Sequence, residues 1–444
     1  MRLLGGSSAY RTTPVTLERC PLNLIELLRT LGAPEAVDLF ANHWEESEAC
    51  FPAHRPRFLQ PAVLCDARAL GGLDAAANAP LDAAAERVAA SPELSHLAWH
   101  AHRLLFEHPE YEAARIGQWP LLIACLGDWA GAFYLLIALD AVPRMRAVHQ
   151  RLGIPDEVSR ATCLHYREPV RVYMDHHDGH YGLLPGNLYW WRNHVRGDLY
   201  RLGRLEYMRK PFHGCVQAFR HRRTRDVVAL AVTGTEFDAE GLVAGGTREA
   251  AWSARLEQRA DAWAGTPVTP HGRALQCQVV LCTRTWEPAL QPGDPVLEVH
   301  IPAGGGMTLA RCHHSMSWAA RFFSRHLPDA TAVGFACYSW ILNPDLARIY
   351  RPDGNLVQWQ RQLYLFPVPC GDRSGLNFVF GTEPTDLCAA PRDTSLRRAL
   401  LDHLLAGGRL AAGGMFLLDE EFERFGAQVY RNRWDRTALS LEAE

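Results

Sequence analysis

The stretch from Gly293 to Leu342 constrains the fold more than any other part of the chain. It opens with Val296 to Ile301, an apolar run rich in β-branched residues between Gly-Asp-Pro and Pro-Ala-Gly-Gly-Gly, which predicts a short buried strand. Thr308 stands at a helix-cap position, and apolar residues then recur at helical spacing until Pro328. A second apolar run covers residues 332–340. The predicted order is strand, glycine loop, helix, strand.

The glycine loop Ala303-Gly304-Gly305-Gly306 lies where a helix can bind an anion. The first N–H groups of a helix lack internal acceptors and carry partial positive charge, and glycines let a ligand approach the backbone closely. The loop is not G-x-G-x-x-G, and it lacks the Lys-Ser/Thr of a P-loop. It therefore indicates either a phosphate- or pyrophosphate-binding loop or a plain connector.

Composition limits the classes of protein that fit. With 444 residues, 48% of them hydrophobic, the chain can bury a large core and form two or three domains. The formal net charge is −3 and basic residues are scattered, which argues against a nucleic-acid partner. Lys210 is the sole lysine, so any Schiff-base chemistry would fall on it.

Targeting signals are not recognisable in this sequence. The first residues do not continue into the apolar core of a signal peptide, and the longest apolar run, Trp129 to Leu139, is shorter than the roughly 18 residues of a membrane span. That run predicts a buried helix. Twelve cysteines without a C-x-x-C pair suit a reducing compartment. We expect a cytoplasmic protein without a membrane partner.

Periodicity divides the chain into three parts. Residues 1–153 predict a helical N-terminal domain, residues 154–390 a mixed β-sheet domain flanked by helices, and residues 391–444 a C-terminal helical extension. The fold class is α/β (α+β). The predicted helices of the first part are two within Asn23–Ala41, then Ala75–Ala90, Pro92–Glu107 and Ile116–Val142. The second part predicts strands at 205–207, 216–219, 227–232, 275–282, 356–366 and 376–380, with a surface helix or loop at 250–264.

Four residues in one turn raise the question of a metal site. His176, His177, Asp178 and His180 bring imidazoles and a carboxylate together in sequence. Adjacent histidines in an Asp-Gly turn point apart, however, and no H-E-x-x-H or similar ligand spacing is present. We therefore expect a polar turn and no metal.

Three phrases carry a family resemblance. LYWWRNHVRGDLYRLGRLEY (Leu188–Tyr207), GDPVLEVHIPAGGGMT (Gly293–Thr308) and YSWILNPDLARIYRPDGNLVQWQ (Tyr338–Gln360) are similar to a bacterial family of acyltransferase domain-containing proteins. That family places a helical N-terminal domain ahead of a GNAT-like C-terminal domain. The order of elements from about residue 154 to 381 likewise resembles the GNAT superfamily of N-acyltransferases, and the resemblance as a whole covers about residues 22–381.

The resemblance implies an enzyme with acyl-CoA as cosubstrate. An acyl group would pass from acyl-CoA, or from a carrier-protein thioester, to the amine of a small molecule by direct attack. The residues that would bind the cosubstrate are Ile301, Ala303, Gly304, Gly305, Gly306 and Thr308. In GNAT proteins the loop reads Q/R-x-x-G-x-G/A; here the Gln/Arg is absent and Pro302 stands within the loop.

Strand alternation supplies the catalytic candidates. Glu298 and His300 share one face of the first strand, and His300 is the candidate general base because a free imidazole titrates near neutrality; a hydrogen-bonded core histidine is the alternative. The resemblance places Tyr350 where the acid that meets the leaving thiolate is found, with an ordinary packed tyrosine as the alternative. Ser339 completes the catalytic set, and the candidate substrate-binding residues are Trp191, His194, Trp340 and Asn343.

Two other functions compete with the transferase. A GNAT-like scaffold without catalysis would bind a metabolite or a partner protein, which the altered glycine loop favours. A Cys/His hydrolase would use Cys337 with His300, although a cysteine in an apolar strand is usually inert. The sequence leaves the acceptor amine, the acyl chain and the oligomeric state open.

Overall fold

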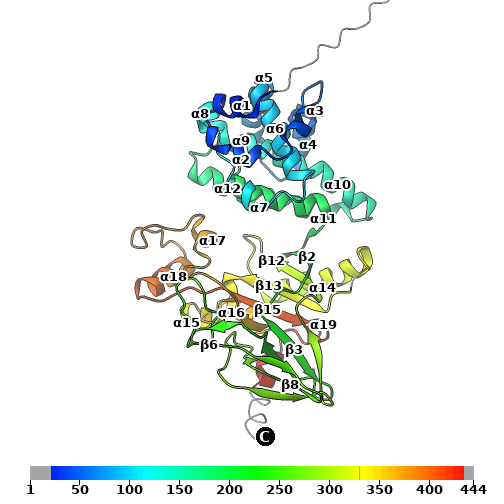
Figure 1. The fold of residues 1–444 in the computed structure, drawn as a ribbon, viewed down its shortest axis with the longest axis vertical. Helices are drawn as coiled ribbons and strands as arrows, with labels where there is room; N and C mark the ends of the chain where they lie inside the picture. Colours follow the sequence, from blue (N-terminus) through cyan, green and yellow to red (C-terminus); the bar gives the residue numbers. More distant parts are fainter. Residues whose placement is uncertain (1–21, 330, 435–444) are drawn as a thin grey trace, which may run out of the picture. The chain divides into compact units, whose positions relative to one another are not determined.

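The computed structural model describes residues 22–329 and 331–434, which form two compact units (Figure 1). The first unit comprises the chain up to Asp66, Ala75–Asp140 and Tyr173–Tyr189. The second comprises Ala67–Asp74, Ala141–Val172 and the chain from Trp190 onward. Helices dominate the first unit and a mixed sheet the second, which confirms the α/β (α+β) class.

The first unit is built from short helices around a central apolar one. Its helices are α1 (Leu24–Thr30), α2 (Val37–Phe40), α3 (Trp44–Ala49), α5 (Asn78–Ala90), α6 (Pro92–Phe106), α7 (Ala113–Ile116), α8 (Ile123–Leu126) and α9 (Ala130–Leu139), with α4 (Pro61–Leu70) and α12 (Arg167–His176) running across the division. Asn23 caps α1, its side chain accepting the N–H groups of Ile25 and Glu26. All ten residues of α9 are buried, which confirms the buried helix predicted there.

The long helix predicted over Ile116–Val142 is broken into several pieces. Pro120 lacks an amide donor, and Gly127 adopts φ +56°, so the chain leaves helical geometry twice before α9. By length and composition Ile123–Arg151 is apolar enough to cross a membrane, but 67% of its most apolar window is buried inside the protein, as in a core helix.

The second unit carries the remaining elements. Its helices are α10 (Ala141–Arg151), α11 (Asp156–Cys163), α13 (Trp191–Arg196), α14 (Leu309–His326), α15 (Leu346–Ile349), α16 (Asn355–Gln360), α17 (Leu376–Phe380), α18 (Ser395–Leu405) and α19 (Asp419–Phe422). Its strands are β1 (Leu199–Leu202), β2 (Leu205–Pro211), β3 (Val216–His221), β4 (Val227–Ala231), β5 (Glu236–Phe237), β6 (Trp252–Ser253), β7 (Leu256–Gln258), β8 (Ala262–Gly265), β9 (Pro267–Val268), β10 (Val279–Cys282), β11 (Trp286–Leu290), β12 (Pro295–His300), β13 (Gly334–Ser339), β14 (Tyr364–Pro367) and β15 (Gly413–Leu418).

A six-stranded sheet in the order β1-β2-β12-β13-β15-β14 forms the centre of this unit. Only β12 and β13 pair in parallel; the other neighbours are antiparallel. The crossover between β12 and β13 contains the glycine loop and α14, as the sequence predicted. Smaller sheets, β11-β3-β4-β9, β10-β8-β7 and β5-β6, complete the unit.

Helix α14 is fixed to the sheet by one buried hydroxyl. Thr308 caps the helix, its side chain accepting the N–H of Arg311. The Ser315 hydroxyl accepts the N–H of Leu205 at 3.1 Å, lies 2.9 Å from the Tyr207 hydroxyl and donates to the Leu202 carbonyl. These contacts join the helix to the β1–β2 turn.

Replacing Ser315 by alanine should lower the free energy of unfolding by about 1–3 kcal/mol, because a buried N–H and a buried hydroxyl lose their partner. The measurement is the urea midpoint followed by far-UV circular dichroism. Ser324→Ala is the matched control, since that exposed hydroxyl bonds only within its own helix. Equal midpoints for the two variants would show that the Ser315 contacts contribute nothing.

Three local predictions were wrong. The segment 250–264, predicted as a helix or loop, forms β6, β7 and β8. These strands are too short for an alternation of apolar and polar residues to be recognised in the sequence. The strand predicted at 356–366 is α16 followed by β14, and the strand predicted at 376–380 is α17. Short apolar runs do not distinguish a buried strand from a short helix, which explains the last two errors.

The chain after residue 391 was predicted as a helical extension, and this is only partly right. Helices α18 and α19 lie there, but β15 between them is an inner strand of the central sheet, paired with both β13 and β14. Its two glycines permit this position: a Cβ at Gly413 would lie 2.2 Å from the Leu342 carbonyl oxygen, and one at Gly414 would lie 2.2 Å from the Phe366 ring. The C-terminal segment therefore completes the sheet.

Candidate active site

The parallel pairing of β12 and β13 stops after two residues. Leu297 pairs with Phe335 and Glu298 with Ala336, and the ladder then ends although both strands continue. On their outer sides β12 remains paired with β2 through His300, and β13 remains paired with β15 through Ser339. Strands β12 and β13 therefore diverge beyond Glu298 and Ala336 and form a fork. Within the fork, the backbone polar groups of one strand do not pair with those of the other.

The glycine loop follows directly from one arm of this fork. Gly304, Gly305 and Gly306 have φ of +79°, +75° and +62°, a run of left-handed residues that side-chain-bearing residues rarely adopt. None of the amide N–H groups of residues 303–307 donates a hydrogen bond within the part of the chain that the structure describes. Successive free amides next to a helix N-terminus are suited to bind phosphate.

Two arginines hold the loop by its carbonyl groups. Arg204, in the turn between β1 and β2, donates from Nε to the Gly306 carbonyl at 2.9 Å and from a terminal nitrogen to the Pro302 carbonyl at 2.8 Å. Arg311 donates to the Gly305 carbonyl. With these carbonyls engaged, the loop amides are left for a ligand. Arg204 also supplies positive charge next to a loop that lacks the Gln/Arg of the GNAT pattern.

Glu298 and His300 lie on one face of β12 and contact each other, as alternation predicted. Nε2 of His300 is 3.2 Å from a Glu298 carboxylate oxygen. Burial alone would raise the pKa of Glu298, but the contact with His300 and the charges of His213 and Lys210 together lower it. An ionised carboxylate next to an imidazole orients the ring, which suits a general base.

A second carboxylate and histidine lie beside this pair on the same face of the sheet. Glu206 of β2 is directly opposite His300 in the β2–β12 register and is 1% exposed. Nδ1 of His165 lies 3.2 Å from the Glu206 carboxylate. Burial would raise the pKa of Glu206, but His165 and Arg201 outweigh it and lower the pKa.

Aromatic rings join the two pairs. The Trp190 ring stacks on His165 with centroids 5.7 Å apart and meets His300 edge-on at 5.0 Å. His165 and His300 therefore share one aromatic neighbour. This tryptophan and His165 were not among the sequence candidates, although both lie within residues 164–200, a segment dense in His, Trp, Tyr and Arg.

Tyr338 on the other arm of the fork is a further residue that the sequence reasoning missed. Its side chain falls on the same face as Glu298, since Ala336 pairs with Glu298 and Tyr338 is two residues on. The Tyr338 ring stacks on His213 with centroids 4.0 Å apart, and its hydroxyl accepts the His213 amide at 3.2 Å. Burial raises the pKa of Tyr338, so its hydroxyl keeps its proton at neutral pH.

Four predicted site residues have structural contacts elsewhere in the unit. The Ser339 hydroxyl accepts the Ile341 amide, and the Tyr350 hydroxyl lies 3.2 Å from the Ser395 hydroxyl. Asn343 is 2% exposed and accepts the Asp345 amide through its side chain. Trp340 packs against both the main core and the smaller apolar cluster around Leu376, Leu400 and Leu410. The described contacts do not join these four side chains to Glu298 and His300.

The predicted substrate-binding residues Trp191 and His194 are both buried. Trp191 is 0% exposed and stacks on Tyr166 at 3.8 Å, and His194 is 1% exposed, 5.5 Å from the His165 ring. Burial lowers the pKa of His194 to about 3. Their positions make them the support of His165, and the prediction that they contact a substrate stays a prediction.

Buried neutral histidines should make this unit sensitive to acid. Burial lowers the pKa of His194 to about 3 and that of His149 to about 4, whereas the unfolded chain titrates near 6.5. The unfolded state therefore binds more protons between pH 6.5 and the folded pKa values, so stability is complete above pH 6.5 and falls as pH is lowered. Each residue should remove about 1.4 kcal/mol per pH unit in this window.

Urea midpoints at pH 7 and pH 5 test this expectation, with a lower midpoint at pH 5. His194→Gln should reduce the pH dependence even if it lowers stability at both values. A midpoint that does not change with pH, or an unchanged dependence in the variant, would contradict the assignment of these histidines as neutral in the native state.

Two other readings of the sequence find little support in the geometry. Burial raises the pKa of Cys337, so a thiolate nucleophile for a hydrolase is disfavoured. In the turn with His176, His177, Asp178 and His180, two of the rings have different partners. Nδ1 of His177 is hydrogen-bonded to the Tyr173 carbonyl at 2.8 Å, and Nε2 of His180 lies 3.6 Å from the Asp128 carboxylate.

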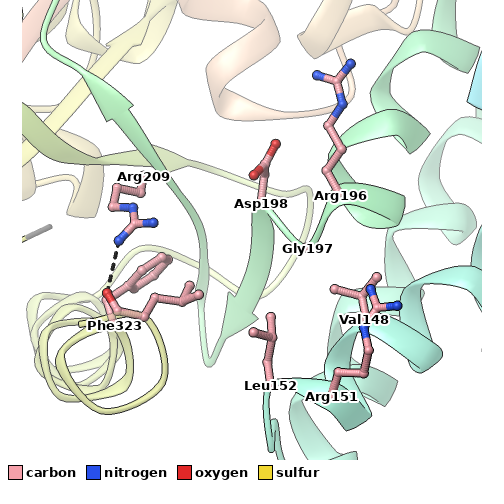
Figure 2. Close-up of a pocket in the computed structure, with 9 residues that line it drawn as sticks. Val148, Arg151, Leu152, Arg196, Gly197, Asp198, Arg209 and Phe323 are labelled. Carbon is pink, nitrogen blue, oxygen red and sulfur yellow. Dashed lines mark hydrogen bonds between the residues drawn. The ribbon is translucent and has the colours of Figure 1, made fainter. Parts of the chain in front are cut away.

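A pocket of about 420 Å³ lies in the same unit but shares no residue with the fork (Figure 2). Arg151, Arg196, Arg209 and Asp198 provide its polar groups, and Arg209 donates to the Leu327 carbonyl at 3.0 Å. The fork, the glycine loop and the Glu298–His300 pair are therefore a site distinct from this pocket.

Comparison with protein families agrees with this geometry. Residues 199–416 match the GNAT-like C-terminal domain, and residues 64–197 match the N-acyltransferase N-terminal domain. The chain belongs to this two-domain acyltransferase family. The fork and the glycine loop fall within the GNAT-like domain, and His165, Trp190 and His194 fall within the range of the other model.

Solved structures of acyltransferases share the fold. A point mutant bound to octanoyl-CoA is 22% identical, with a TM-score of 0.59, and the match covers 89% of this chain and 99% of that one. A complex with decanoyl-CoA and teicoplanin has the same identity and coverage and a TM-score of 0.58. A complex with CoA and 10C-teicoplanin has the same identity and coverage and a TM-score of 0.59. Among curated proteins, no sequence matches the chain.

Proposed function

We propose that this protein transfers an acyl group from acyl-CoA to an amine of a small molecule by direct attack. The observation that carries the proposal is the fork between β12 and β13 together with the free amides of residues 303–307 at its mouth. The amides suit the pyrophosphate of CoA, and the fork offers backbone donors to the thioester carbonyl. The similar acyltransferases bound to octanoyl-CoA and decanoyl-CoA favour a medium-length acyl chain.

In the proposed reaction, a residue on one strand of the fork accepts a proton and a residue on the other strand donates one. His300, paired with Glu298, accepts the proton of the attacking amine. The amine nitrogen forms a bond to the thioester carbonyl carbon, and the carbon–sulfur bond then breaks. Tyr338, on the other arm of the fork, holds a proton on its hydroxyl at neutral pH and donates it to the leaving thiolate. We favour Tyr338 over Tyr350, since it lies on the fork and on the same face as His300.

An acyl-CoA panel tests the transfer. Acetyl-CoA, octanoyl-CoA and decanoyl-CoA are mixed with a set of amines, and thiol release is followed together with the mass of the product. We expect amine-dependent release with an N-acylated product. Thermal stabilisation by acyl-CoA without release for any amine would instead support a binding module, and the absence of both effects would refute the use of acyl-CoA.

The panel should include one specific candidate for the acceptor. One similar structure contains teicoplanin beside decanoyl-CoA, so teicoplanin is a rational first acceptor. Simple aminosugars and aliphatic amines provide comparison. N-acylation of the simple amines alone would place the acceptor in another class without affecting the assignment of the donor.

A further inference from the structure

The residues assigned so far leave one proton of the transfer reaction without an acceptor. An aliphatic amine, like the lysine side chain with its pKa of about 10.4, is an ammonium ion at pH 7 and has no lone pair with which to attack. Its nitrogen has three N–H bonds and the amide product keeps one, so two protons must leave the nitrogen. His300 accepts one of them, and Tyr338 supplies the proton of the leaving thiolate. The reaction therefore needs a second acceptor, one that acts before the attack.

We propose that His165, held by Glu206, accepts this first proton, an assignment that rests on the acyl transfer proposed above. His165 lies in the 3-10 turn Leu164–Tyr166, and its Nδ1 is 3.2 and 3.5 Å from the two oxygens of the Glu206 carboxylate. In the neutral ring, a proton on Nδ1 is donated to this carboxylate and the lone pair lies on Nε2. Within residues 22–329 and 331–434, Nε2 has no hydrogen-bond partner, and the side chain is 21% exposed. Nε2 can therefore accept a proton from a substrate.

The position of this pair places it beside the transfer site. Glu206 on β2 is the direct partner of His300 on β12, so the two side chains point to the same face of the sheet. The Trp190 ring stacks on His165 with centroids 5.7 Å apart and meets His300 edge-on at 5.0 Å. The acceptor proposed for the first proton thus lies next to the acceptor for the second.

The charged and titratable neighbours of His165 hold its ring without competing for the proton. Burial would raise the pKa of Glu206, but His165 and Arg201 outweigh this effect and keep the carboxylate ionised. Arg201 on β1 lies 3.9 Å from the other Glu206 oxygen. The His194 ring on α13 is 5.5 Å away between centroids, and burial lowers its pKa to about 3, so it is neutral at pH 7. An ionised carboxylate at one nitrogen fixes the tautomer and orientation of the imidazole, an arrangement that serves a general base.

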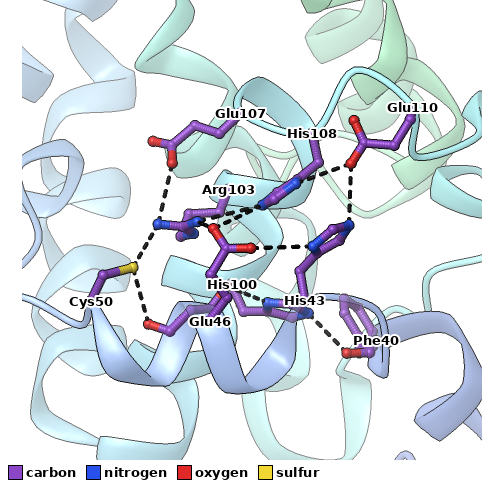
Figure 3. A network of polar contacts seen from close by, with 10 residues as sticks. Phe40, His43, Glu46, Cys50, His100, Arg103, Glu107, His108 and Glu110 are labelled. Carbon is purple, nitrogen blue, oxygen red and sulfur yellow. Dashed lines mark hydrogen bonds and ion pairs between the residues drawn. The ribbon is translucent and has the colours of Figure 1, made fainter.

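Histidine–carboxylate contacts in the first unit show how a purely structural pair differs. His43 has a carboxylate at both ring nitrogens, Nδ1 being 3.3 Å from Glu46 and Nε2 3.1 Å from Glu110 (Figure 3). His108, stacked on it, likewise has neighbours at both nitrogens. Neither ring keeps a nitrogen for a substrate, whereas His165 uses one nitrogen for its carboxylate and keeps the other.

Two amines of different basicity separate this role from that of His300. Butylamine is an ammonium ion at pH 7, whereas trifluoroethylamine is largely uncharged and needs no first deprotonation. His165→Asn retains an N–H for Glu206 but has no group that accepts a proton. It should lower kcat/KM for butylamine by about 10²–10⁴-fold and leave that for trifluoroethylamine nearly unchanged. His300→Ala should lower both, because the second proton leaves either amine.

A pH profile gives a second readout with whichever amine of the acyl-CoA panel is acylated. As the pH rises toward the pKa of that amine, solvent removes the first proton and His165 is no longer needed. For an aliphatic amine the neutral fraction grows about tenfold per pH unit between pH 7 and pH 9. The deficit of His165→Asn should shrink at the same rate, whereas that of His300→Ala should persist.

The control is His314→Asn, since this histidine is exposed on α14. Circular dichroism and calorimetric titration with CoA establish that each variant is folded and binds the donor. An equal loss with both amines at every pH would make His165 a structural support and overturn the proposal, as would full activity of His165→Asn with butylamine at pH 7. An unmodified protein that releases no thiol with any amine would refute the transfer itself, and this assignment with it.

Discussion

Replacing His300 by alanine lowers the kcat of amine-dependent thiol release by about 10²–10⁴-fold, the usual contribution of a positioned general base. The affinity for acyl-CoA should change little, because we propose that the loop amides, and not the imidazole, bind the phosphates. The measurement is steady-state release of CoA thiol with a saturating amine. The pH profile of kcat should also lose its lower limb, since the base that must be neutral is gone.

His314→Ala is the matched control, because this histidine is exposed on α14 and lies outside the fork. Glu298→Gln should reduce the rate less than His300→Ala, as it removes only the charge that orients the ring. If His300→Ala retains the full kcat, His300 is a core histidine, and His165 with Glu206 becomes the pair to examine.

Replacing Arg204 by methionine should weaken the binding of CoA by about 10–100-fold. The variant removes two hydrogen bonds from a charged donor, each worth about 1.5–3 kcal/mol, that hold the Pro302 and Gly306 carbonyls. Without them the loop carbonyls can rotate toward the ligand and the free amides lose their common direction. Calorimetric titration with CoA measures the effect, and desulfo-CoA serves equally well because the thiol is not involved.

Arg321→Met provides the comparison. This arginine is exposed on α14, the helix that follows the glycine loop, and lies well beyond the helix's first turn. Thermal melts separate a local effect from loss of the fold: the loop should lose affinity for CoA in a protein that still melts cooperatively. Unchanged affinity in Arg204→Met would mean that the loop is rigid through its glycines alone.

Much of the catalytic half could be read from the sequence, because it is local. Neighbouring residues decide where the strand Val296–Ile301 begins and ends, where Thr308 caps the helix, and that the helix ends before Pro328. The structure confirms β12 and α14 there. Alternation along one strand likewise places Glu298 beside His300. These are short-range consequences of backbone geometry, which composition and spacing express directly.

Partners from distant segments could not be read in this way. Glu206 faces His300 only because β2 is antiparallel to β12, and Arg204 reaches a loop about one hundred residues later in the chain. The inner strand β15 reads as part of a helical tail until its glycines are seen against Leu342 and Phe366. In each case the pairing depends on register and packing, for which a single sequence carries no local signal.

The sequence by itself determined the strand, glycine loop, helix and strand of the GNAT-like half and the buried helix α9, because capping, turn chemistry and hydrophobic period act within a few residues. Only the tertiary structure decided where the β12–β13 ladder ends, which arginines hold the loop, and that His165 meets Glu206. Those features depend on contacts between segments far apart in the chain, and such contacts exist only once the core has packed.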